Sequence, residues 1–357
     1  MTRLRIAVLF GGRSAEHDVS IMSARNVVEA LDADRFEVIP VFVTRDGRWL
    51  GQELAEGRLP ETIAEGGAEL AFLPGGRGRL LAVTGAGAPR ELPAIDLIFP
   101  VLHGLHGEDG SVQGFAEVLG VPLVGCGILG SATAIDKDVT KRLLAAAGLP
   151  VARFVTVQQG ETPSFETVSA ALGLPLFVKP ARQGSSVGVS KVTTPDGFAA
   201  ALAEAFRHDR KVLVEEFVQG REIELSVLER PDGELFVSLP GEIAAADSHG
   251  FYSYDAKYID ADGAVLSVPA QLPEDDIARL QRMAREAFLC LGCDGMARVD
   301  FFLRGDGSLV VNEINTIPGF TDISMYAKAL DASGIRYAQV IEALVAHGLA
   351  RAGRTTA

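Results

Sequence analysis

Continuous apolar runs of strand length alternate with a helical pattern through the first part of the chain. Residues 4–10 (LRIAVLF), 36–43 and 95–102 are such runs, and continuous apolar strands are typical of sheets covered on both faces. Between the first two runs, apolar residues recur at helical spacing over residues 21–31. This pattern predicts an open α/β domain with a parallel sheet over residues 1–125.

Two polar loops follow strands of this predicted sheet: GGRSAEHD at residues 11–18 and HGLHGEDG at residues 103–110. Ligands of open α/β sheets bind at the carboxyl ends of the strands. The second loop carries His103 and His106 beside Glu108. A zinc site would need a further fixed ligand, so the loop favours either a substrate contact or a structural histidine with satisfied ring nitrogens.

Shorter strands mixed with helices make up the rest of the chain. Apolar spacing predicts one helix over Ser131–Ala147, which Gly148 ends. Short strand runs and helical segments alternate from there to the C-terminus. We therefore predict two α+β parts, at residues 126–215 and 216–357, after the N-terminal domain.

The segment Ala297–Asn315 is the most informative stretch of the chain. Two runs of alternating apolar and polar residues flank Gly305-Asp306-Gly307, which predicts a hairpin with a two-residue turn at Asp306-Gly307. Side chains alternate between the faces of a strand, so the turn fixes which side chains meet. A three-residue loop would shift the register by one residue. The predicted register pairs Gly305 with Ser308, Asp300 with Glu313, and Arg298 with Asn315.

This hairpin would place Asp300, Glu313 and Asn315 on one face, with Arg298 beside them. Directly opposed carboxylates repel each other, and a divalent cation would remove the repulsion, because carboxylate and amide oxygens are ligands that Mg²⁺ takes. A metal with a positively charged anion clamp is typical of phosphoryl transfer. The alternative is a solvated sheet face on which each carboxylate pairs with a lysine. The opposite face is a core face, which favours the predicted register, and it carries Val299, Phe301, Leu309, Val311 and Ile314.

A loop rich in glycine and serine joins two predicted strands between Lys179 and Val189. Small residues there let backbone N–H groups approach phosphate oxygens, the hydroxyls of Ser185 and Ser186 add donors, and a lysine before the loop can pair with phosphates. An ordinary long hairpin loop is the alternative. The sequence has no GxxxxGK[ST] motif and no GxGxxG after the first strand, so neither a P-loop nor a dinucleotide-binding site is predicted.

Two further positions could contact a nucleotide. Lys137 lies on a predicted helix, where a solvated lysine is the alternative. The segment Glu215–Glu222 closes one strand and opens another. Its extended backbone could bind an adenine edge, and the Glu222 carboxylate could accept both ribose hydroxyls; ordinary surface charge is the alternative here.

A long polar stretch, Glu242–Asp262, interrupts the strands of the third part. It carries Lys257 and Tyr258 together with Tyr252 and Tyr254. Long polar loops within compact enzymes are often lids. We therefore expect this stretch to cover a site.

Composition limits the class of protein. With 357 residues, 48% hydrophobic and 22% charged, the chain is typical of a globular protein of two or three domains. Its net charge of −14 argues against binding of nucleic acid or of an anionic membrane. The apolar runs are too short to span a membrane, and the short apolar start indicates a buried strand rather than a signal peptide, so we expect a cytoplasmic protein. We expect reduced structural thiols at the three cysteines, because no second pair of zinc ligands is near; they are Cys126, Cys290 and Cys293.

Motifs that follow one another along nearly the whole chain resemble those of a known family. They are Gly11-Gly12-Arg13-Ser14-Ala15-Glu16-His17; His103-Gly104 with Gly107-Glu108-Asp109-Gly110; Asp136-Lys137; Val178-Lys179-Pro180 with Gly184-Ser185-Ser186-Val187-Gly188; Ala256-Lys257-Tyr258; Ala297-Arg298-Val299-Asp300; and Asn312-Glu313-Ile314-Asn315-Thr316 with Pro318-Gly319-Phe320-Thr321. Together they resemble the D-alanine–D-alanine ligases of the ATP-grasp superfamily; residues 44–92 match poorly. The resemblance implies a three-part ATP-grasp architecture of the α/β and α+β classes, in which an open parallel-sheet N-terminal domain precedes two α+β parts that grip ATP.

The resemblance also implies roles for single residues. The ATP-binding residues would be Lys137, Lys179 and Lys257 at the phosphates, Ser186 in the loop, Glu215 and Val218 at the adenine, and Glu222 at the ribose. Two Mg²⁺ or Mn²⁺ ions would be held by Asp300, Glu313 and Asn315. The first D-alanine would meet Glu16 with His103 nearby, and the second would meet Ser324 and the backbone N–H of Met325. Developing negative charge would be stabilised by Arg298 and the backbone N–H of Gly319, and Ser185 and Tyr258 would bond to each other and to Glu16 to close the lid.

The implied reaction is the ATP-dependent ligation of two D-alanine molecules through an acylphosphate, for peptidoglycan precursor synthesis, by a homodimer. One alternative is a D-alanine–D-lactate ligase, but such enzymes usually lack the lid tyrosine, so Tyr258 favours the dipeptide. A second is another ATP-grasp carboxylate–amine ligase, such as a glutathione-synthetase relative, which would not share Glu16-His17 with Pro318–Thr321. A third is a non-catalytic nucleotide-binding module, which should have lost a metal ligand or a phosphate lysine; all are present here.

Overall fold

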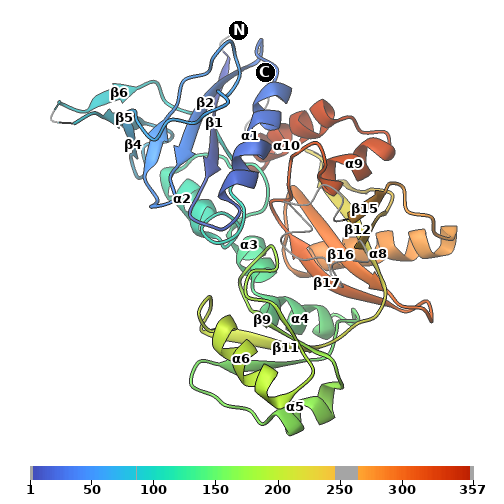
Figure 1. Ribbon diagram of the computed structural model, residues 1–357. Helices are drawn as coiled ribbons and strands as arrows, with labels where there is room; N and C mark the ends of the chain where they lie inside the picture. The colour runs from blue at the N-terminus through green and yellow to red at the C-terminus, as the bar shows by residue number, and fades with distance from the viewer. Residues whose placement is uncertain (1–2, 86, 246–263, 354–357) are drawn as a thin grey trace.

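The computed structural model describes residues 3–85, 87–245 and 264–353. Their strands form three sheets, which succeed one another along the chain. Figure 1 shows the first sheet at the upper left, the third at the right and the second below, with helices between them. Lys257 and Tyr258 lie outside the described residues. The domain boundaries expected near residues 125 and 215 stay predictions.

The first sheet has a parallel centre and an antiparallel extension. Its order is β6-β5-β4-β3-β2-β1-β7, and β1 (Leu4–Gly11) pairs in parallel with both β2 (Phe36–Val43) and β7 (Leu97–Pro100). These are the three apolar runs that the sequence predicts as strands. The antiparallel extension consists of β3 (Trp49–Gly51), β4 (Glu69–Phe72), β5 (Leu80–Val83) and β6 (Arg90–Leu92).

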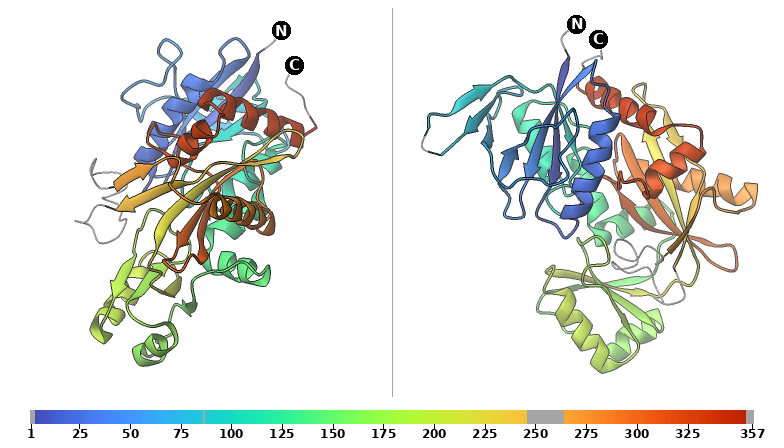
Figure 2. Two further views of the ribbon diagram at one scale, coloured as in Figure 1. Left: turned by 90° about the vertical axis from the view of Figure 1, so that its right-hand side faces the viewer. Right: turned by 45° about the horizontal axis from the view of Figure 1, so that its top comes forward.

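Alternate side chains of β1 face two different cores, because strand side chains alternate. Ile6 and Val8 join a core with helices α1 and α10, whereas Ala7 and Leu9 join a core with helix α2. The sheet is therefore covered on both faces, and the C-terminal helix lies against the N-terminal domain, as Figure 2 shows for the red helix beside the blue one. The helices are α1 (His17–Ala30), α2 (Ser111–Leu119) and α10 (Tyr337–Arg351).

The helix predicted over Ser131–Ala147 is two helices, α3 (Ile128–Ile135) and α4 (Lys137–Ala146), so the single-helix prediction was wrong. Asp136 between them is extended (φ −86°, ψ 97°), and its side chain accepts a hydrogen bond from the Val139 N–H. A carboxylate at this position satisfies an N–H group that the start of a helix leaves open. Lys137 consequently begins α4 instead of lying within a longer helix.

The second sheet is antiparallel, with the order β10-β9-β11-β8. Helices α5 and α6 share one apolar core with it. The glycine- and serine-rich loop joins β9 to β10, as the sequence predicts. The elements are β8 (Phe154–Gln158), α5 (Phe165–Leu172), β9 (Leu176–Pro180), β10 (Ser190–Val192), α6 (Pro195–Ala205) and β11 (Lys211–Glu216).

The third sheet is also antiparallel, in the order β15-β14-β12-β16-β17, with β13 paired to β12. Helix α8 covers one face with apolar side chains that include Leu280, Ala284 and Phe288. Opposite this apolar face the strands carry charged residues. The elements are β12 (Arg221–Glu229), β13 (Leu235–Val237), β14 (Gly241–Ala245), β15 (Ala264–Ser267), α8 (Glu274–Cys290), β16 (Met296–Leu303), β17 (Leu309–Asn315) and α9 (Met325–Ala332).

The hairpin of β16 and β17 has the predicted pairs but not the predicted turn. The two-residue turn was wrong: the Arg304 N–H donates to the Ser308 carbonyl at 2.9 Å, so Gly305, Asp306 and Gly307 form a three-residue loop. Leu303 pairs with Leu309, one residue off the predicted register. A β-bulge places Asn312 as an extra residue between Val311 and Glu313, and this restores the pairs Asp300–Glu313 and Arg298–Asn315.

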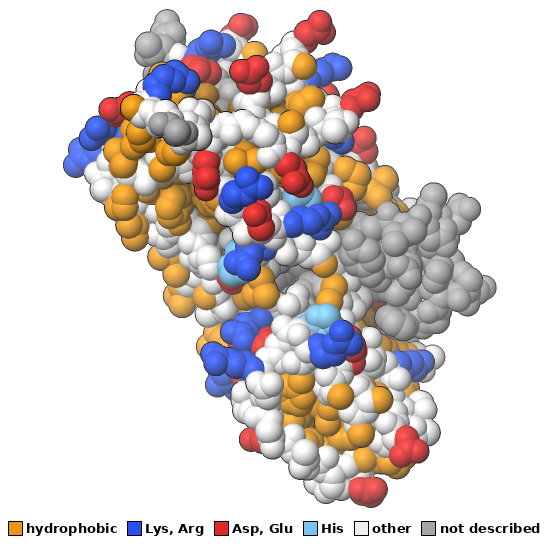
Figure 3. All heavy atoms as spheres, turned by 60° about the vertical axis from the view of Figure 1, so that its left-hand side comes forward, with side chains coloured by type: hydrophobic (Ala, Val, Ile, Leu, Met, Phe, Trp, Pro, Cys, Tyr) orange, Lys and Arg blue, Asp and Glu red, His pale blue; other side chains and the backbone are white. Residues whose placement is uncertain are grey.

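No helix among the described residues is long and apolar enough to cross a membrane. On the described part of the face in Figure 3, acidic and basic side chains are interspersed. The exposed apolar side chains include Val118 of α2, which is 62% exposed, and Leu129 of α3, which is 68% exposed. These two helices contact each other.

Candidate active site

Three carboxylates lie in one row across neighbouring strands. Glu224 of β12 pairs in register with Asp300 of β16, which pairs with Glu313 of β17. In the next row lies Arg298, whose guanidinium holds Asp300 with two hydrogen bonds of 2.8 and 2.7 Å and lies 2.9 Å from Glu224. Asn315 Nδ2 donates to Asp300 at 3.0 Å. The four side chains predicted to share one face of the hairpin therefore do so; they are Arg298, Asp300, Glu313 and Asn315.

Arg298 is the positive centre of this row. Burial acts to lower its pKa, but the charges of Asp300 and Glu224 outweigh burial and raise the pKa. Arg298 therefore stays charged, and it offers positive charge beside the carboxylates for a second anion. Glu224 is a site residue that the sequence analysis missed; it lies two positions after Glu222, on the same strand face, and that spacing was the available signal.

Asp300, Glu313 and Asn315 have the donor chemistry of a magnesium site. Their carboxylate and amide oxygens are hard ligands, and two carboxylates at directly opposed positions favour a cation between them. Among the described residues, no three His, Cys, Asp or Glu side chains gather as a metal site. The metal site proposed here does not need three such side chains, because the amide oxygen of Asn315 supplies the third ligand. The donor set therefore fits a hard divalent cation.

A second charged cluster lies between α4 and the second sheet, and its Glu215 and Lys141 are buried. Glu215 of β11 lies 2.8 Å from Lys179 of β9 and 3.3 Å from Lys141 of α4. Burial raises the pKa of Glu215, but the two lysines outweigh burial and lower it. Lys141 is 0% exposed, and burial lowers its pKa. The sequence analysis missed Lys141, although it lies four residues after Lys137 on one helix face.

The glycine-rich loop reaches across to the N-terminal domain. Ser185 Oγ donates to Glu16 Oε1 at 2.5 Å, which joins two of the three groups predicted to close the lid. Ser185 and Ser186 have φ angles of 49° and 58°, in the left-handed region, so the loop backbone is strained there. A Cβ atom on Gly184 would lie 3.0 Å from Glu16 Oε2. The loop thus depends on a small residue where it meets Glu16.

Lys137 lies between this loop and the hairpin. Its Nζ donates to the Gln183 carbonyl at 2.7 Å and lies 3.6 Å from Glu313. It stands at the first position of α4, where the helix dipole adds positive potential. A phosphate group beside Glu313 would therefore meet both a lysine and the start of a helix.

His103 and Glu108 connect the N-terminal domain to the segment after β17. His103 Nδ1 lies 2.9 Å from the Ile317 carbonyl, and Glu108 accepts hydrogen bonds from Ile317 N–H at 2.9 Å and Gly104 N–H at 2.7 Å. Burial lowers the pKa of His103. Burial and the charge of Glu16 raise the pKa of Glu108 to about 8. Glu108 stood in a quoted motif, but the sequence analysis gave it no role.

The predicted residues for a second substrate lie at the start of α9. Ser324 is the residue before the helix, and its Oγ accepts a hydrogen bond from the Thr321 N–H at 3.0 Å. Met325 begins the helix, so its N–H group lies at the positive end of the helix dipole. A Cβ atom on Gly319 would lie 2.6 Å from Ser324 Oγ. Gly319 and Ser324 are therefore in close contact.

The residues predicted at the nucleoside lie along the edge between the second and third sheets. Val218 is 7% exposed and packs against Ala152 and Val310. Glu222 on β12 pairs in register with Phe302 and Ile243. Lys257 and Tyr258 lie outside the described residues, so their contacts stay predictions.

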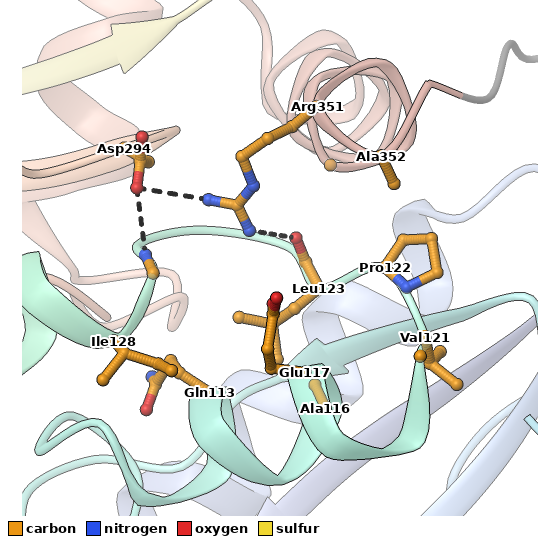
Figure 4. A pocket seen from close by; sticks show the side chains of 13 residues that line it. Gln113, Ala116, Glu117, Val121, Pro122, Leu123, Ile128, Asp294, Arg351 and Ala352 are labelled. Atoms are coloured by element: carbon orange, nitrogen blue, oxygen red, sulfur yellow. Dashed lines mark hydrogen bonds and ion pairs between the residues drawn. The ribbon is translucent and has the colours of Figure 1, made fainter. Parts of the chain in front are cut away.

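Several of these residues line one small space. A cavity of about 60 Å³ is bounded by side chains of the N-terminal domain, the glycine-rich loop and the hairpin, and by the segment after β17. A larger cavity lies elsewhere, with a volume of about 530 Å³, between α2, α3 and α10. Figure 4 shows Arg351 there bonded to the Leu123 carbonyl and paired with Asp294. The small cavity is lined by Glu16, Val19, His103, Glu108, Gly184, Ser185, Arg298, Glu313, Asn315, Ile317, Pro318 and Gly319.

Comparison with known proteins relates both halves of the chain to one family. Residues 5–126 match the family described as D-ala D-ala ligase N-terminus, and residues 143–346 match the family described as D-ala D-ala ligase C-terminus. The D-alanine–D-alanine ligase A of Mesorhizobium japonicum is 61% identical over 352 residues, 98% of each chain. The D-alanine–D-alanine ligase A of Brucella suis is 58% identical over 349 residues, again 98% of each chain.

Solved structures are similar over nearly the full length. The D-alanine–D-alanine ligase from Coxiella burnetii has a TM-score of 0.84 and 33% identity, covering 99% of this chain and 96% of that one. The VanG D-Ala:D-Ser ligase from Enterococcus faecalis also has a TM-score of 0.84, with 34% identity over 97% of this chain and 100% of that one.

Proposed function

The chain belongs to the D-alanine–D-alanine ligase family, and we propose that its site joins two D-alanine molecules to D-alanyl-D-alanine as ATP is converted to ADP and phosphate. The product would serve peptidoglycan precursor synthesis. The ATP-grasp fold expected from the motifs is confirmed by the solved relatives. The observation that supports the reaction most is the meeting of Glu16, Ser185, Arg298 and Glu313, from different parts of the chain, around one cavity.

We place the ATP phosphates beside the two charged clusters. Lys137 and Lys179 each pair with a carboxylate in the structure, Glu313 and Glu215, and both lie where phosphate oxygens could take up their charge. Ser186 would add a donor from the loop. Lys257 would add a third lysine, and the nucleoside would contact Glu215 and Val218 at its adenine and Glu222 at its ribose.

We place the first D-alanine in the small cavity. Its ammonium group would face the Glu16 carboxylate, which Ser185 holds from the other side, with His103 nearby; Tyr258 would join Ser185 when the lid closes. The second D-alanine would lie toward α9, where its carboxylate would accept hydrogen bonds from Ser324 and the Met325 N–H. A helix start favours such an anion.

The proposed mechanism has two chemical steps. Transfer of the γ-phosphoryl group to the first D-alanine gives an acylphosphate, because a free carboxylate is a poor electrophile. The neutral amine of the second D-alanine then attacks the acyl carbon, and phosphate leaves. Arg298 and the Gly319 N–H would stabilise the oxyanion formed between these events. Exclusion of water by the closed loop would protect the acylphosphate from hydrolysis.

We further propose that Asp300, Glu313 and Asn315 hold two Mg²⁺ or Mn²⁺ ions. When bound, such ions supply positive charge that neutralises the transferring phosphoryl group. Arg298 would remain beside them, since it already holds Asp300 through two hydrogen bonds.

A direct assay tests the proposed function. ADP release should be measured with D-alanine, L-alanine, D-lactate and D-serine in parallel, and the product identified by mass spectrometry. We expect D-alanine to support release and to yield the dipeptide, and the other amino or hydroxy acids to add little when supplied alone. Equal release with L-alanine, or a depsipeptide formed in preference from D-alanine and D-lactate at neutral pH, would contradict the proposal.

We also propose that the enzyme acts as a homodimer in the cytoplasm, where ATP is available. The exposed apolar side chains of Val118 and Leu129, on contacting helices, offer a surface for a second copy. Light scattering during gel filtration would test this: a dimeric mass is expected, and a monomer at micromolar concentration would contradict it.

A further inference from the structure

The segment after β17 is held by side chains of the N-terminal domain at two residues, Ile317 and Phe320, on either side of Pro318-Gly319. On the first side, the Ile317 N–H donates to Glu108 Oε1 at 2.9 Å, and the Ile317 carbonyl lies 2.9 Å from His103 Nδ1. On the second side, the Phe320 N–H donates to Ser23 Oγ at 3.1 Å. Ile317 and Phe320 are thus both fixed from across the domain boundary.

The Phe320 carbonyl is fixed as well. Asn26, on the same helix as Ser23, donates from Nδ2 to this carbonyl at 3.0 Å and to Asp322 at 2.9 Å. The backbone N–H and carbonyl of one residue belong to successive peptide planes. The plane before the Pro318–Gly319 peptide is therefore held by His103 at the Ile317 carbonyl, and the plane after it by Ser23 at the Phe320 N–H. Because hydrogen bonds are directional, these two bonds restrict the orientation of the peptide plane between them.

The direction of each hydrogen bond in this network follows from its chemistry. A carbonyl only accepts, so His103 Nδ1 carries a proton and donates to Ile317. Burial lowers the pKa of His103, which keeps the ring neutral and leaves Nε2 as an acceptor. Ser23 Oγ, 3.3 Å from Nε2, accepts from Phe320 and has its own proton to donate to the ring. The network therefore has one consistent arrangement, from Phe320 through Ser23 and His103 to Ile317.

The part of the network around Ser23, His103 and Ile317 is buried. Ser23 is 0% exposed, His103 5% and Ile317 2%. Buried polar groups of this kind cannot exchange a lost partner for water, so removal of one hydroxyl leaves its partners unpaired. The Gly319 N–H, in contrast, makes no hydrogen bond to any described residue, and Gly319 lines the same cavity as Arg298.

We propose that Ser23 and Glu108 are positioning residues, which act through the peptide groups of Ile317 and Phe320 to aim the Gly319 N–H at the oxyanion of the second chemical step. This inference rests on the proposed function, since it needs the acyl carbon to lie beside Gly319. Ser23 does not line the cavity, and Glu108, which does, acts in this role through its bond to the Ile317 N–H. The N-terminal domain would thereby supply part of the alignment of an oxyanion donor that the C-terminal part carries.

The test compares two serines of one helix. Ser23→Ala removes the hydroxyl between Phe320 and His103. Ser20→Ala is the matched control: Ser20 is also 0% exposed on α1, and its Oγ also accepts one backbone bond, from Gly11, and donates another, to Val101. Ser20 makes no bond to the segment that carries Gly319. The melting temperatures of both variants would measure how much stability is lost when one buried hydroxyl group is removed from α1.

Two kinetic quantities separate alignment of the oxyanion donor from general damage. Net dipeptide formation needs the oxyanion, whereas exchange of ¹⁸O between the bridging and non-bridging positions of ATP needs only reversible acylphosphate formation. We expect Ser23→Ala to lower kcat for dipeptide formation by ~10- to 100-fold, as for a misdirected oxyanion donor. The KM for ATP should stay within about twofold, and the ratio of exchange to net turnover should rise about tenfold or more.

The control and a second variant complete the test. Ser20→Ala should keep the parental ratio of exchange to turnover, and Glu108→Gln, which replaces one accepting oxygen by a donor, should raise it as Ser23→Ala does. A Ser23→Ala enzyme with the kcat of the control, or one that loses exchange and turnover in equal proportion, would overturn the inference. Failure of the proposed function itself is distinguishable, because the parent enzyme would then release no ADP with D-alanine.

Discussion

Glu215 holds together a buried cluster that has one negative and two positive charges, and its replacement by glutamine is a sharp test of that arrangement. Lys179 lies 2.8 Å and Lys141 3.3 Å from its carboxylate. The side chains of Glu215 and Lys141 are 6% and 1% exposed. Glu215→Gln keeps the shape of the residue but leaves two ammonium groups in the interior without their counter-charge. Lys141→Met, in contrast, removes a buried charge and keeps the better-placed pair.

The expected effects differ in size. Removal of one partner from a buried ion pair costs about 3–5 kcal/mol, whereas replacement of a buried charge by an apolar side chain is often neutral or stabilising. Glu215→Gln should therefore lower the free energy of unfolding by about 3–5 kcal/mol, and Lys141→Met should change it by at most about 1 kcal/mol. In the double variant, Glu215→Gln should lower the free energy of unfolding by about 2 kcal/mol less than it does in the parent chain. The reason is that Lys141→Met has already removed one of the two ammonium groups that would be left without a counter-charge.

Hydrogen exchange at the amides of β11 would measure these differences locally, because this strand lies between β9 and β8 and carries Glu215. The pH dependence gives a further check. In Glu215→Gln, Lys141 loses the charge that supports its proton, so the folded chain binds fewer protons than the unfolded one, and stability should rise with pH toward the ordinary lysine pKa. A cost below about 1 kcal/mol for Glu215→Gln, together with additive effects in the double variant, would refute the reasoning.

Three further predictions concern the catalytic face. The pKa of Glu108 is raised to about 8 from 4.5, so between these pH values the folded chain holds a proton that the unfolded chain releases. Stability should therefore fall as pH rises, by up to about 5 kcal/mol. Glu108→Gln should make the melting temperature less dependent on pH between pH 5 and 8, and a pH dependence equal to that of the parent would count against this prediction. Gly319→Ala would bring a Cβ within 2.6 Å of Ser324 Oγ, so kcat should fall by ~10- to 100-fold with little change in melting temperature; parental kcat would show that the contact is unimportant. Glu313→Ala should abolish D-alanine-dependent ADP release while the circular dichroism spectrum stays parental, and normal turnover would remove the metal assignment.

The hairpin shows how far the sequence could be followed. The pairing of Asp300 with Glu313 was predicted correctly from a turn that was wrong, because the three-residue loop and the bulge at Asn312 shift the register in opposite directions. The signal for the bulge was present: Val311 and Ile314 are both core residues, three positions apart, where strict alternation would place them an even number apart. Core burial on one face fixed the pairs more strongly than the turn did.

The remaining site residues were harder to predict because their partners are distant in sequence. Ser23 and His103 belong to the part of the chain with the first sheet, whereas Phe320 follows the third sheet, and no local period places them together. The break at Asp136 was missed for a local reason: apolar spacing continues through it, and only its capping side chain marks the end of one helix and the start of the next.

The central claim is that Asp300, Glu313 and Asn315 hold divalent ions beneath the terminal phosphate of ATP. Electron paramagnetic resonance of Mn²⁺, titrated in the presence of a non-hydrolysable ATP analogue, measures the bound ions directly. The account predicts two tightly bound Mn²⁺ ions per chain in the parent and at most one in Glu313→Ala, with the analogue still bound. The same number of ions, bound with the same affinity, in parent and variant would contradict it.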